Sequence, residues 1–339
     1  MKRLISIFTL VLVLVVTSCT HKELCFNHSD HAHRFHIRVM ADYRLDWEEY
    51  GYRDWSTLWP ADYLDYESLR PKTPTGLRVV NYSPNGNYNM HNIQASGGTI
   101  TLYEGENDIL FYNNDTEYIV FSRQDDGTGA TTRATTRTTT RATYSGNTFA
   151  EEGEKTVNAP DMLFANYHEN YVSYKTLGPV DYPVTLQPLV FTYKIRYEFA
   201  EGLKYVASCR GALTGMARDV NMNTGETSEE GATILFDCDK TDFGARALVK
   251  SFGIPGYPHP NYPVTRGAKH GLQLEVMLRN GKIVTFDFDV ADQVNAQPHG
   301  GVIVVKDIVI KEEDGVQGSG SFDVEVDDWG DYEDIVLPL

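Results

Sequence analysis

The sequence lacks several features that would assign it to common classes of protein. Only 4 of its 339 residues are cysteines, which excludes a small fold held together by disulfides. Its 47 acidic residues outnumber 30 basic ones, giving a formal net charge of −17. Such a chain is poorly suited to nucleic acid, whose phosphates must be neutralised by Lys and Arg. An aromatic content of 12% excludes a wholly disordered chain.

Motifs of the common enzyme classes are also missing. The chain has no Gly-x-Ser-x-Gly turn, no His-Glu-x-x-His motif and no Gly-x-Gly-x-x-Gly motif. Adjacent acids such as Glu48-Glu49 point to opposite faces of a strand, so they do not form the facing carboxyl pair of a glycoside hydrolase. We therefore expect no catalytic residue, and an envelope hydrolase is only a third hypothesis, based on abundant carboxylates.

Two groups of potential metal ligands lack a complete ligand set. The loop from Asp219 to Glu230 resembles an EF-hand, but Thr224 stands where that motif has Gly, and a β-hairpin loop is the simpler interpretation. Five histidines near the N-terminus are better explained as part of a polar tether than as a metal site. They are His21, His28, His31, His33 and His36. We expect no metal and no cofactor.

The N-terminus has the pattern of an export signal. The uncharged run Leu4–Val16 is too short for a membrane-spanning helix, which needs roughly 20 residues. The Val-Thr-Ser-Cys sequence that ends at Cys19 resembles the lipobox of bacterial lipoproteins. We therefore expect residues 1–18 to be a signal peptide, Cys19 to be lipidated and residues 19–33 to tether the body to the outer membrane at the cell surface. The alternative is a secreted protein with a free Cys19.

Short alternating runs between turn residues predict β-strands through the rest of the chain. Asn280-Gly281 predicts a hairpin turn. Asn113 to Asp115 predicts a second turn, which joins strands 109–112 and 118–121 in a hairpin. Many short strands with regular turns are typical of an all-β fold built from β-sandwiches.

The chain is long enough for two domains. A stretch punctuated by prolines places their boundary near residue 180, so we predict an N-terminal β-sandwich over 34–180 and a C-terminal one over 181–339. Segment 127–143 repeats Thr and Arg, and we expect it to be an exposed disordered loop. A protease-sensitive site is the alternative for this segment.

Two further sets of residues are candidate sites. Cys209 and Cys238 form a possible disulfide in an oxidising envelope. Trp47, Trp55 and Trp59 lie in an aromatic stretch. Aromatic side chains of this kind stack on sugars in glycan-binding sites, and they also pack in domain cores and interfaces. We favour the core or interface interpretation for these three residues.

Four features occur together in this chain: the lipobox-like Cys19, the turn 113–117, the stretch 213–221 and the acidic ending 322–329. In combination they resemble the fimbrillin-like lipoproteins of Bacteroides, among them the fimbrial anchor relatives. The resemblance implies two tandem transthyretin-like (immunoglobulin-like) β-sandwich domains after a lipoprotein signal peptide. It also implies a lipid anchor in the outer membrane, and partners that are other fimbrial subunits joined by β-strand exchange.

These features favour a cell-surface lipoprotein of the fimbrial type, acting in pilus assembly or adhesion. A retained lipid without a clear processing site fits an anchor or accessory subunit better than a shaft subunit. The alternative function is a glycan-binding surface lipoprotein of a polysaccharide-uptake system, motivated by the aromatic stretch.

Overall fold

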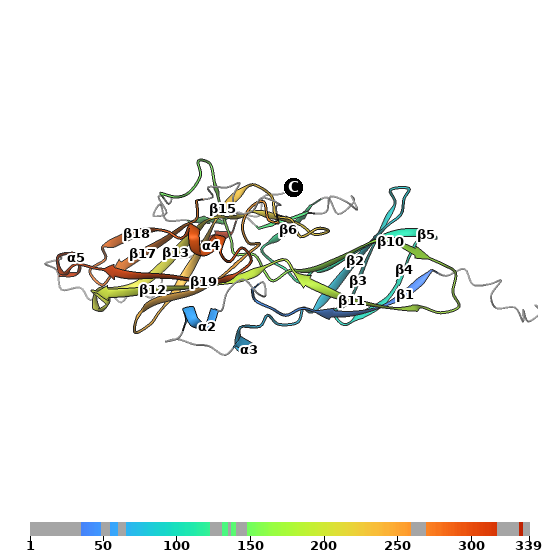
Figure 1. The fold of residues 1–339 in the computed structure, drawn as a ribbon, viewed down its shortest axis with the longest axis horizontal. Helices are drawn as coiled ribbons and strands as arrows, with labels where there is room; N and C mark the ends of the chain where they lie inside the picture. Colours follow the sequence, from blue (N-terminus) through green and yellow to red (C-terminus); the bar gives the residue numbers. More distant parts are fainter. Residues whose placement is uncertain are drawn as a thin grey trace, which may run out of the picture.

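A computed structural model of the chain describes residues 35–48, 55–59, 66–122, 131–134, 137–139, 148–258, 269–316 and 332–334. In these residues the protein is almost entirely β-structure, arranged as two domains that lie end to end (Figure 1). The described helices are short: α2 (Trp55–Leu58), α3 (Tyr66–Leu69), α4 (Ala291–Asn295), α5 (Glu312–Val316) and the 3-10 turn η2 (Leu203–Tyr205). The all-β class and the two β-domains predicted from the sequence are confirmed.

The N-terminal domain is a closed barrel. Around the barrel its strands are β1 (His36–Tyr43), β11 (Val180–Pro188), β10 (Phe164–Ser173), β5 (Gly105–Asn113), β2 (Gly76–Tyr82), β3 (Tyr88–Gln94) and β4 (Gly97–Thr101), and β4 pairs again with β1. Strand β1 is parallel to β11 and antiparallel to β4. The barrel closes between β10 and β11 through two residue pairs, Phe164 with Pro188 and Ala165 with Gln187.

The C-terminal domain is an open sheet. Its strands follow in the order β18 (Ile283–Asp289), β17 (Gly271–Leu278), β13 (Val206–Ala217), β15 (Gly231–Lys240), β16 (Gly244–Ser251), β12 (Phe191–Glu201) and β19 (Gly301–Val309). Strand β12 is parallel to β19 and antiparallel to β16. Its alternation buries Tyr193, Ile195 and Tyr197 in the core, as the period of two predicts.

The two domains have the same strand order and the same strand directions. In each, the first strand (β1 or β12) lies between the last strand, which is parallel to it, and a middle strand, which is antiparallel (β4 or β16). The run β5, β2, β3, β4 of the barrel corresponds to β17, β13, β15, β16 of the open sheet. The chain therefore contains one seven-strand topology twice.

Two segments of the N-terminal domain extend onto the C-terminal domain. The β1–β2 arm, whose described residues are 44–48, 55–59 and 66–75, brings α2 against β19. The second segment, between β5 and β10, carries β6 (Ile119–Ser122), β7 (Thr131–Ala134), β8 (Arg137–Thr139) and β9 (Lys155–Val157). In it, β9 pairs with β15, β7 pairs with β14 (Asp219–Asn221), and β8 pairs with β20 (Tyr332–Asp334). Backbone pairing thus crosses from one domain to the other.

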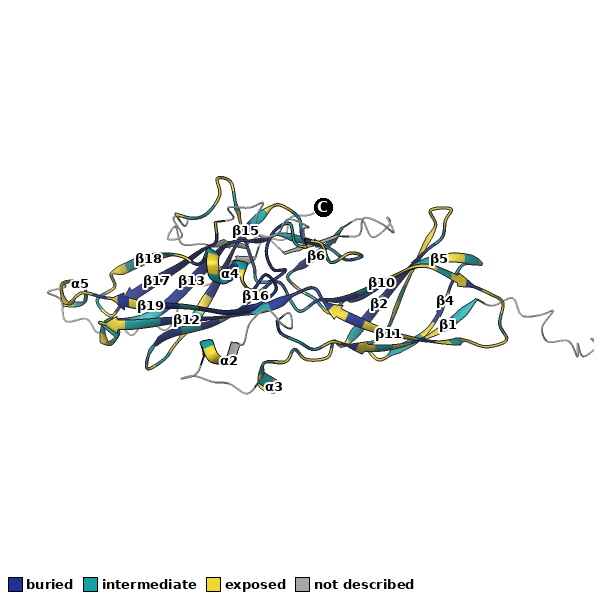
Figure 2. Cartoon of the chain, in the orientation of Figure 1, coloured by how far each residue is buried: buried dark blue, intermediate teal, exposed yellow. Residues whose placement is uncertain are grey.

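Hydrophobic packing is also continuous between the domains. Strand β2 is buried on both faces: Leu77 and Val79 face the barrel core, whereas Val80 and Tyr82 join the core that continues into the C-terminal domain. Figure 2 shows buried strands through the middle of both domains. Since apolar burial stabilises by about 25 cal/mol per Å², this shared core favours a fixed arrangement of the two domains.

The structure differs from the sequence predictions at three places. The N-terminal domain ends with Pro188 of β11 and the C-terminal domain begins with Phe191 of β12, so the boundary follows the expected position near 180. Within 127–143, expected to be a disordered loop, β7 and β8 are strands, consistent with the high strand propensity of Thr. The rest of that segment, the signal peptide 1–18 and the tether 19–33 lie outside the described residues.

The third difference concerns the predicted hairpin at Asn113 to Asp115. Strand β5 pairs with β2 and β10, and β6 instead leaves the barrel to pair with β7. The turn is held to the start of β10 rather than closing on itself, because the Asn113 side chain accepts from the backbone N–H of Phe164 at 2.7 Å. The carboxylate of Asp161 accepts from the backbone of Tyr118 at 2.6 Å. The Asn280-Gly281 hairpin forms as predicted, between β17 and β18.

Candidate functional site

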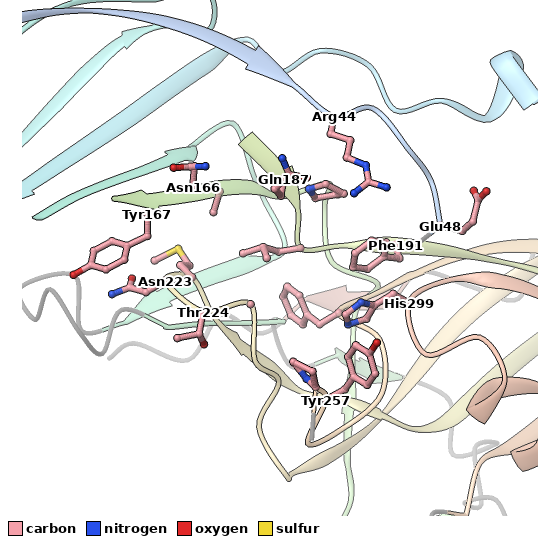
Figure 3. Close-up of a pocket in the computed structure, with 17 residues that line it drawn as sticks. Arg44, Glu48, Asn166, Tyr167, Gln187, Phe191, Asn223, Thr224, Tyr257 and His299 are labelled. Atoms are coloured by element: carbon pink, nitrogen blue, oxygen red, sulfur yellow. The ribbon is translucent and has the colours of Figure 1, made fainter. Parts of the chain in front are cut away.

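A cavity of about 410 Å³ lies in the seam between the domains (Figure 3). Strands β10 and β11 of the barrel form one side, and loops of the C-terminal sheet form the other. The residue Arg44, just after β1, lies at the edge of the cavity. The cavity therefore exists only because both domains and the start of the β1–β2 arm meet here.

An aromatic cluster forms the C-terminal side of this cavity. The rings of Phe191 and His299 are parallel, with centroids 4.4 Å apart, and Tyr257 packs edge-on against His299 at 4.5 Å. Phe191 and His299 are 6% and 8% exposed. Such stacked and edge-on pairs fix ring orientation, so this wall is rigid.

Amide and hydroxyl groups face the aromatic cluster across the cavity. Asn166 and Gln187 come from the barrel, and Asn223 and Thr224 come from the loop after β14 (Figure 3). The Asn166 amide donates to the Thr185 carbonyl at 3.1 Å, which fixes its orientation. Aromatic faces next to amide groups suit a polar organic ligand better than a purely apolar one.

The loop after β14 is the segment whose acids resemble an EF-hand in sequence. Here the side-chain oxygen of Asn221 accepts from the backbone N–H groups of Asn223 (2.8 Å) and Thr224 (3.1 Å), which is the geometry of an Asx turn. Val220 and Thr227 then form an antiparallel bridge. The loop is thus the predicted β-hairpin loop.

Acidic groups are scarce in the seam cavity. Glu48 is the single carboxylate among the residues that line it, and in Figure 3 its side chain points away from His299 and Tyr257. A two-carboxylate hydrolysis needs acids on both sides of a bound sugar. This cavity does not provide that pair. In the described part of the chain, no three His, Cys, Asp or Glu side chains converge as metal ligands.

Burial raises the pKa of Glu48 to about 7. A hydrogen bond from Tyr66 acts in the opposite direction, but its effect is smaller. The nearby carboxylate of Asp46 raises the pKa further. Within the described residues, the Glu48 Oε2 atom is buried and accepts no hydrogen bond. The β1–β2 arm therefore holds a carboxyl group that changes charge near neutral pH.

The predicted aromatic residues of the β1–β2 arm pack on the C-terminal sheet. Trp47 and Trp59 are 0% and 1% exposed and pack with Val302 of β19. Trp47 also accepts, through its carbonyl, a hydrogen bond from the Thr192 amide at 2.6 Å. Neither indole offers an open face to a sugar, so these two residues are interface aromatics. Trp55 begins α2, and its side chain lies outside the described residues.

Two cations of β12 lie beneath Trp59. The Lys194 Nζ atom is 4.3 Å from the centre of the Trp59 ring, and the Arg196 guanidinium is 5.5 Å from it. Both cations are buried, at 1% and 5% exposed. A cation over an indole is attracted by the negative face of the ring, the more so when water is excluded. Sequence reasoning missed this site, because Lys194 and Arg196 alternate with core residues like an ordinary solvated strand face.

The candidate disulfide residues lie directly opposite each other on neighbouring strands. Cys209 of β13 and Cys238 of β15 are register partners, and both are thiols in this structure. Opposed residues in an antiparallel pair have Cα atoms about 4.5–5.5 Å apart, within the range of disulfides. Burial raises the pKa of the Cys209 thiol to about 12. The structure therefore brings the predicted pair together as neutral thiols.

Other predicted features fall beyond the described part of the chain. Cys19 and the acidic ending 322–329 are among them, and of the five N-terminal histidines only His36 is described, at the start of β1. Among the described residues, no helix has the length and apolar character that a membrane span requires.

The chain is similar to proteins of known description over most of its length. It is 22% identical over 306 residues to a candidate fimbrium anchoring subunit, Fim4B, of Bacteroides ovatus, covering 81% of this chain and 88% of that protein. It also resembles the crystal structure of a candidate adhesin from Bacteroides ovatus, with a TM-score of 0.58 and 16% identity, covering 84% of this chain and 95% of the other. These findings confirm the resemblance to fimbrillin-like proteins and the all-β fold with two β-domains.

A family model matches residues 62–237, from the β1–β2 arm through most of β15. The match takes in strands of both domains and the whole of the segment between β5 and β10, which carries β6 to β9. It covers more than half of the chain, which therefore belongs to the family described as domain of unknown function DUF5119.

Proposed function

We propose that the protein is a cell-surface lipoprotein of the fimbrial type, which acts as an anchor or accessory subunit in pilus assembly or adhesion. The observation that carries this proposal is the similarity to a candidate fimbrium anchoring subunit, which extends over both domains. We propose no catalytic role, because the relatives are described as structural or adhesive proteins.

The arrangement of the chain supports an anchor role. Strand β1, which follows the N-terminal tether, begins at the far end of the barrel, whereas α5 lies at the opposite end of the molecule (Figure 1). Lipid on Cys19 would hold the barrel end near the membrane and leave the C-terminal domain pointing outward. Acyl chains anchor because each buried CH₂ contributes about 0.8 kcal/mol.

Gene deletion tests the fimbrial role. We expect loss of the gene to change the number, length or attachment of surface fibres seen by electron microscopy. Cells that carry Cys19→Ala should shed the protein, and fibres attached to it, into the medium. Cys25→Ala, a change at a neighbouring cysteine, is the matched control and should retain attachment. Fibres unchanged in number, length and attachment after deletion would refute the proposal.

We also propose that both domains are transthyretin-like sandwiches and that partners join by β-strand exchange. The repeated seven-strand order supports the first point. The second is supported by β18 and β19, since among the described strands each has one neighbour, β17 and β12 respectively. A strand with one neighbour presents unpaired backbone groups to another chain. A photo-crosslinker at the exposed Ile283 of β18 should capture another fimbrial subunit on intact cells. If no subunit is captured, β18 is not the edge that exchanges strands.

Glycan binding is the second candidate function, and the seam cavity is the place that favours it. Its aromatic wall and its amides at Asn166 and Gln187 are the groups that hold sugars in many proteins. A glycan array with the parent protein and Gln187→Ala tests this candidate. No binding by the parent would eliminate it.

We propose further that Cys209 and Cys238 form a disulfide on the cell surface. Their opposed positions support this pairing. Two thiols would lose two protons and two electrons to a disulfide-type oxidant of the envelope and form one S–S bond. Mass spectrometry of the protein from cells, unreduced and alkylated, should then find neither cysteine alkylated.

A further inference from the structure

Exposed apolar side chains gather at one end of the barrel. Val172, Tyr174 and Leu177 are 57%, 62% and 69% exposed. All three lie in or next to the connection between β10 and β11, which we call the β10–β11 tip (residues 172–179). Large apolar side chains exposed singly are ordinary, but three within six residues form a local patch.

Hydrogen bonds and a ring contact hold the base of the tip, so the backbone keeps these three side chains pointing into water. The Ser173 hydroxyl donates to the Tyr103 carbonyl, and the Asn170 backbone N–H donates to Asp108 at 2.8 Å. The Tyr171 ring packs edge-on against Tyr182 at 5.3 Å. Two strands and an aromatic pair thus support a short connection whose apolar groups face water.

The tip is next to the point where the chain enters the barrel. Ile37 of β1 is the register partner of Val180, the first residue of β11. In Figure 1 the start of β1 and the β10–β11 connection lie at the same end of the molecule, and Figure 2 shows exposed residues there. The tether therefore joins the body beside the apolar patch.

Charge at the tip differs from charge in the rest of the protein. The chain has 47 acidic and 30 basic residues, yet residues 170–180 contain no acid and one base, Lys175. Tyr suits the boundary between water and lipid, because its ring is apolar and its hydroxyl is polar. A Lys at such a boundary keeps its ammonium in water while its stem lies on apolar surface. Glu104, just before β5, and Glu106, the β5 register partner of Val172, favour a neutral membrane over a strongly anionic one.

We propose that the β10–β11 tip inserts into the surface of the lipid bilayer to which the N-terminus is attached. This inference rests on the proposed anchor function. Residues 19–34 number sixteen and span at most about 55 Å when fully extended. Tethering at that range gives a local concentration in about the millimolar range, so weak insertion is enough to hold the tip in place. Three contacts beside one tether fix the tilt of the molecule on the membrane.

The test uses the full mature chain with a histidine tag in place of the lipid, bound to zwitterionic vesicles that contain a nickel-chelating lipid. An environment-sensitive dye is attached at Leu177→Cys or, as the control, at Val316→Cys, both in a Cys25→Ser background. Val316 is also exposed and apolar, at 62%, but lies in α5 at the other end. We expect spin-labelled lipids to quench the dye at position 177 at least threefold more than at 316.

A second variant set confirms the source of the signal. With the dye at Lys175→Cys, replacement of Val172, Tyr174 and Leu177 by Ser should abolish quenching without changing the melting temperature. Equal quenching at 177 and 316 would overturn the proposal. The proposal would also be overturned if the dye at 177 became buried as the protein concentration rose, independently of lipid. That result would mean that the patch binds a second copy of the chain. In this test the tag supplies the tether. A failure of Cys19 lipidation in cells would therefore refute the anchor proposal without affecting the vesicle result, which tests insertion of the tip alone.

Discussion

The two domains share one topology but differ in how it is completed. In the N-terminal domain, two residue pairs between β10 and β11 close the barrel. The corresponding strands of the C-terminal domain, β18 and β19, do not pair with each other. The C-terminal domain instead receives pairing and packing from N-terminal segments, at β9, at β7 and at the β1–β2 arm. The N-terminal domain thus closes its own sheet, while the C-terminal sheet is extended and covered by segments of its neighbour.

A glycine at equivalent positions shows how closely the two copies of the fold correspond. Gly97 begins β4 with φ +117°, and Gly244 begins β16 with φ +147°. A Cβ at Gly97 would collide with the carbonyl oxygen of Val39 in β1, and one at Gly244 with that of Tyr197 in β12. In both domains the backbone of the first strand therefore lies too close to this glycine of its antiparallel neighbour for any side chain to fit there.

The largest effect should come from Gly244→Ala. We expect it to lower the free energy of unfolding by about 4 kcal/mol, and Gly97→Ala by about 2 kcal/mol, since Gly244 is buried beside core strand β12. Gly86→Ala is the control: it has φ +78° but open space around it, and should cost about 1 kcal/mol. Urea unfolding measures all three. A larger loss for Gly97→Ala would mean that the barrel tolerates this collision less well than the C-terminal sheet does.

The next effect concerns the dependence of the C-terminal domain on the arm. Trp59→Ala removes a buried indole and uncovers Lys194 and Arg196, so we expect a loss of about 3 kcal/mol. Calorimetry should then resolve two transitions in place of one, because the arm no longer couples the domains. Leu248→Ala, at an exposed residue of β16, should change stability by about 0.5 kcal/mol at most. A single unshifted transition for Trp59→Ala would show that the arm does not couple them.

Reduction should also distinguish the domains. If Cys209 and Cys238 are joined, the bond closes a segment of thirty residues and stabilises by about 3 kcal/mol. In the parent protein, whose domains melt together, dithiothreitol should lower the single melting temperature. In Trp59→Ala it should lower the melting temperature of the C-terminal transition and leave that of the barrel, which has no cysteine among its described strands, unchanged. The same melting temperature with and without the reductant would show that the two thiols stay unpaired.

The smallest effect is a pH dependence at Glu48. Its pKa is about 7 in the folded protein against an ordinary value of 4.5, so the folded state holds the proton more tightly. Its contribution to stability is therefore present below pH 4.5 and is lost as the pH rises through 7. After allowance for partial exposure, Glu48→Gln should recover about 1 kcal/mol at pH 8 and nothing at pH 4. Stability curves of the two proteins that run parallel between pH 4 and 8 would contradict this.

Local patterns in the sequence predicted much of the fold. Period-two alternation placed β12, and Asn280-Gly281 placed the β17–β18 hairpin, because both depend on residues close together in the chain. The course of β6 was missed, because the Asn113 turn is held by Phe164, about fifty residues later. The seam cavity was missed for the same reason, since His299 and Phe191 come from opposite ends of one domain's sequence.

The position of β1 has a mechanical consequence. It lies between β11 and β4, with seven register pairs on one side and five on the other. If the N-terminus is held at a membrane, as proposed, a pull on it acts along this strand, while the strand's hydrogen bonds lie across it. The force therefore shears all the hydrogen bonds between β1 and its two neighbours at once, rather than breaking them one after another. If a fibre attached to the protein pulls against that membrane, β1 carries the tension through all twelve of these register pairs.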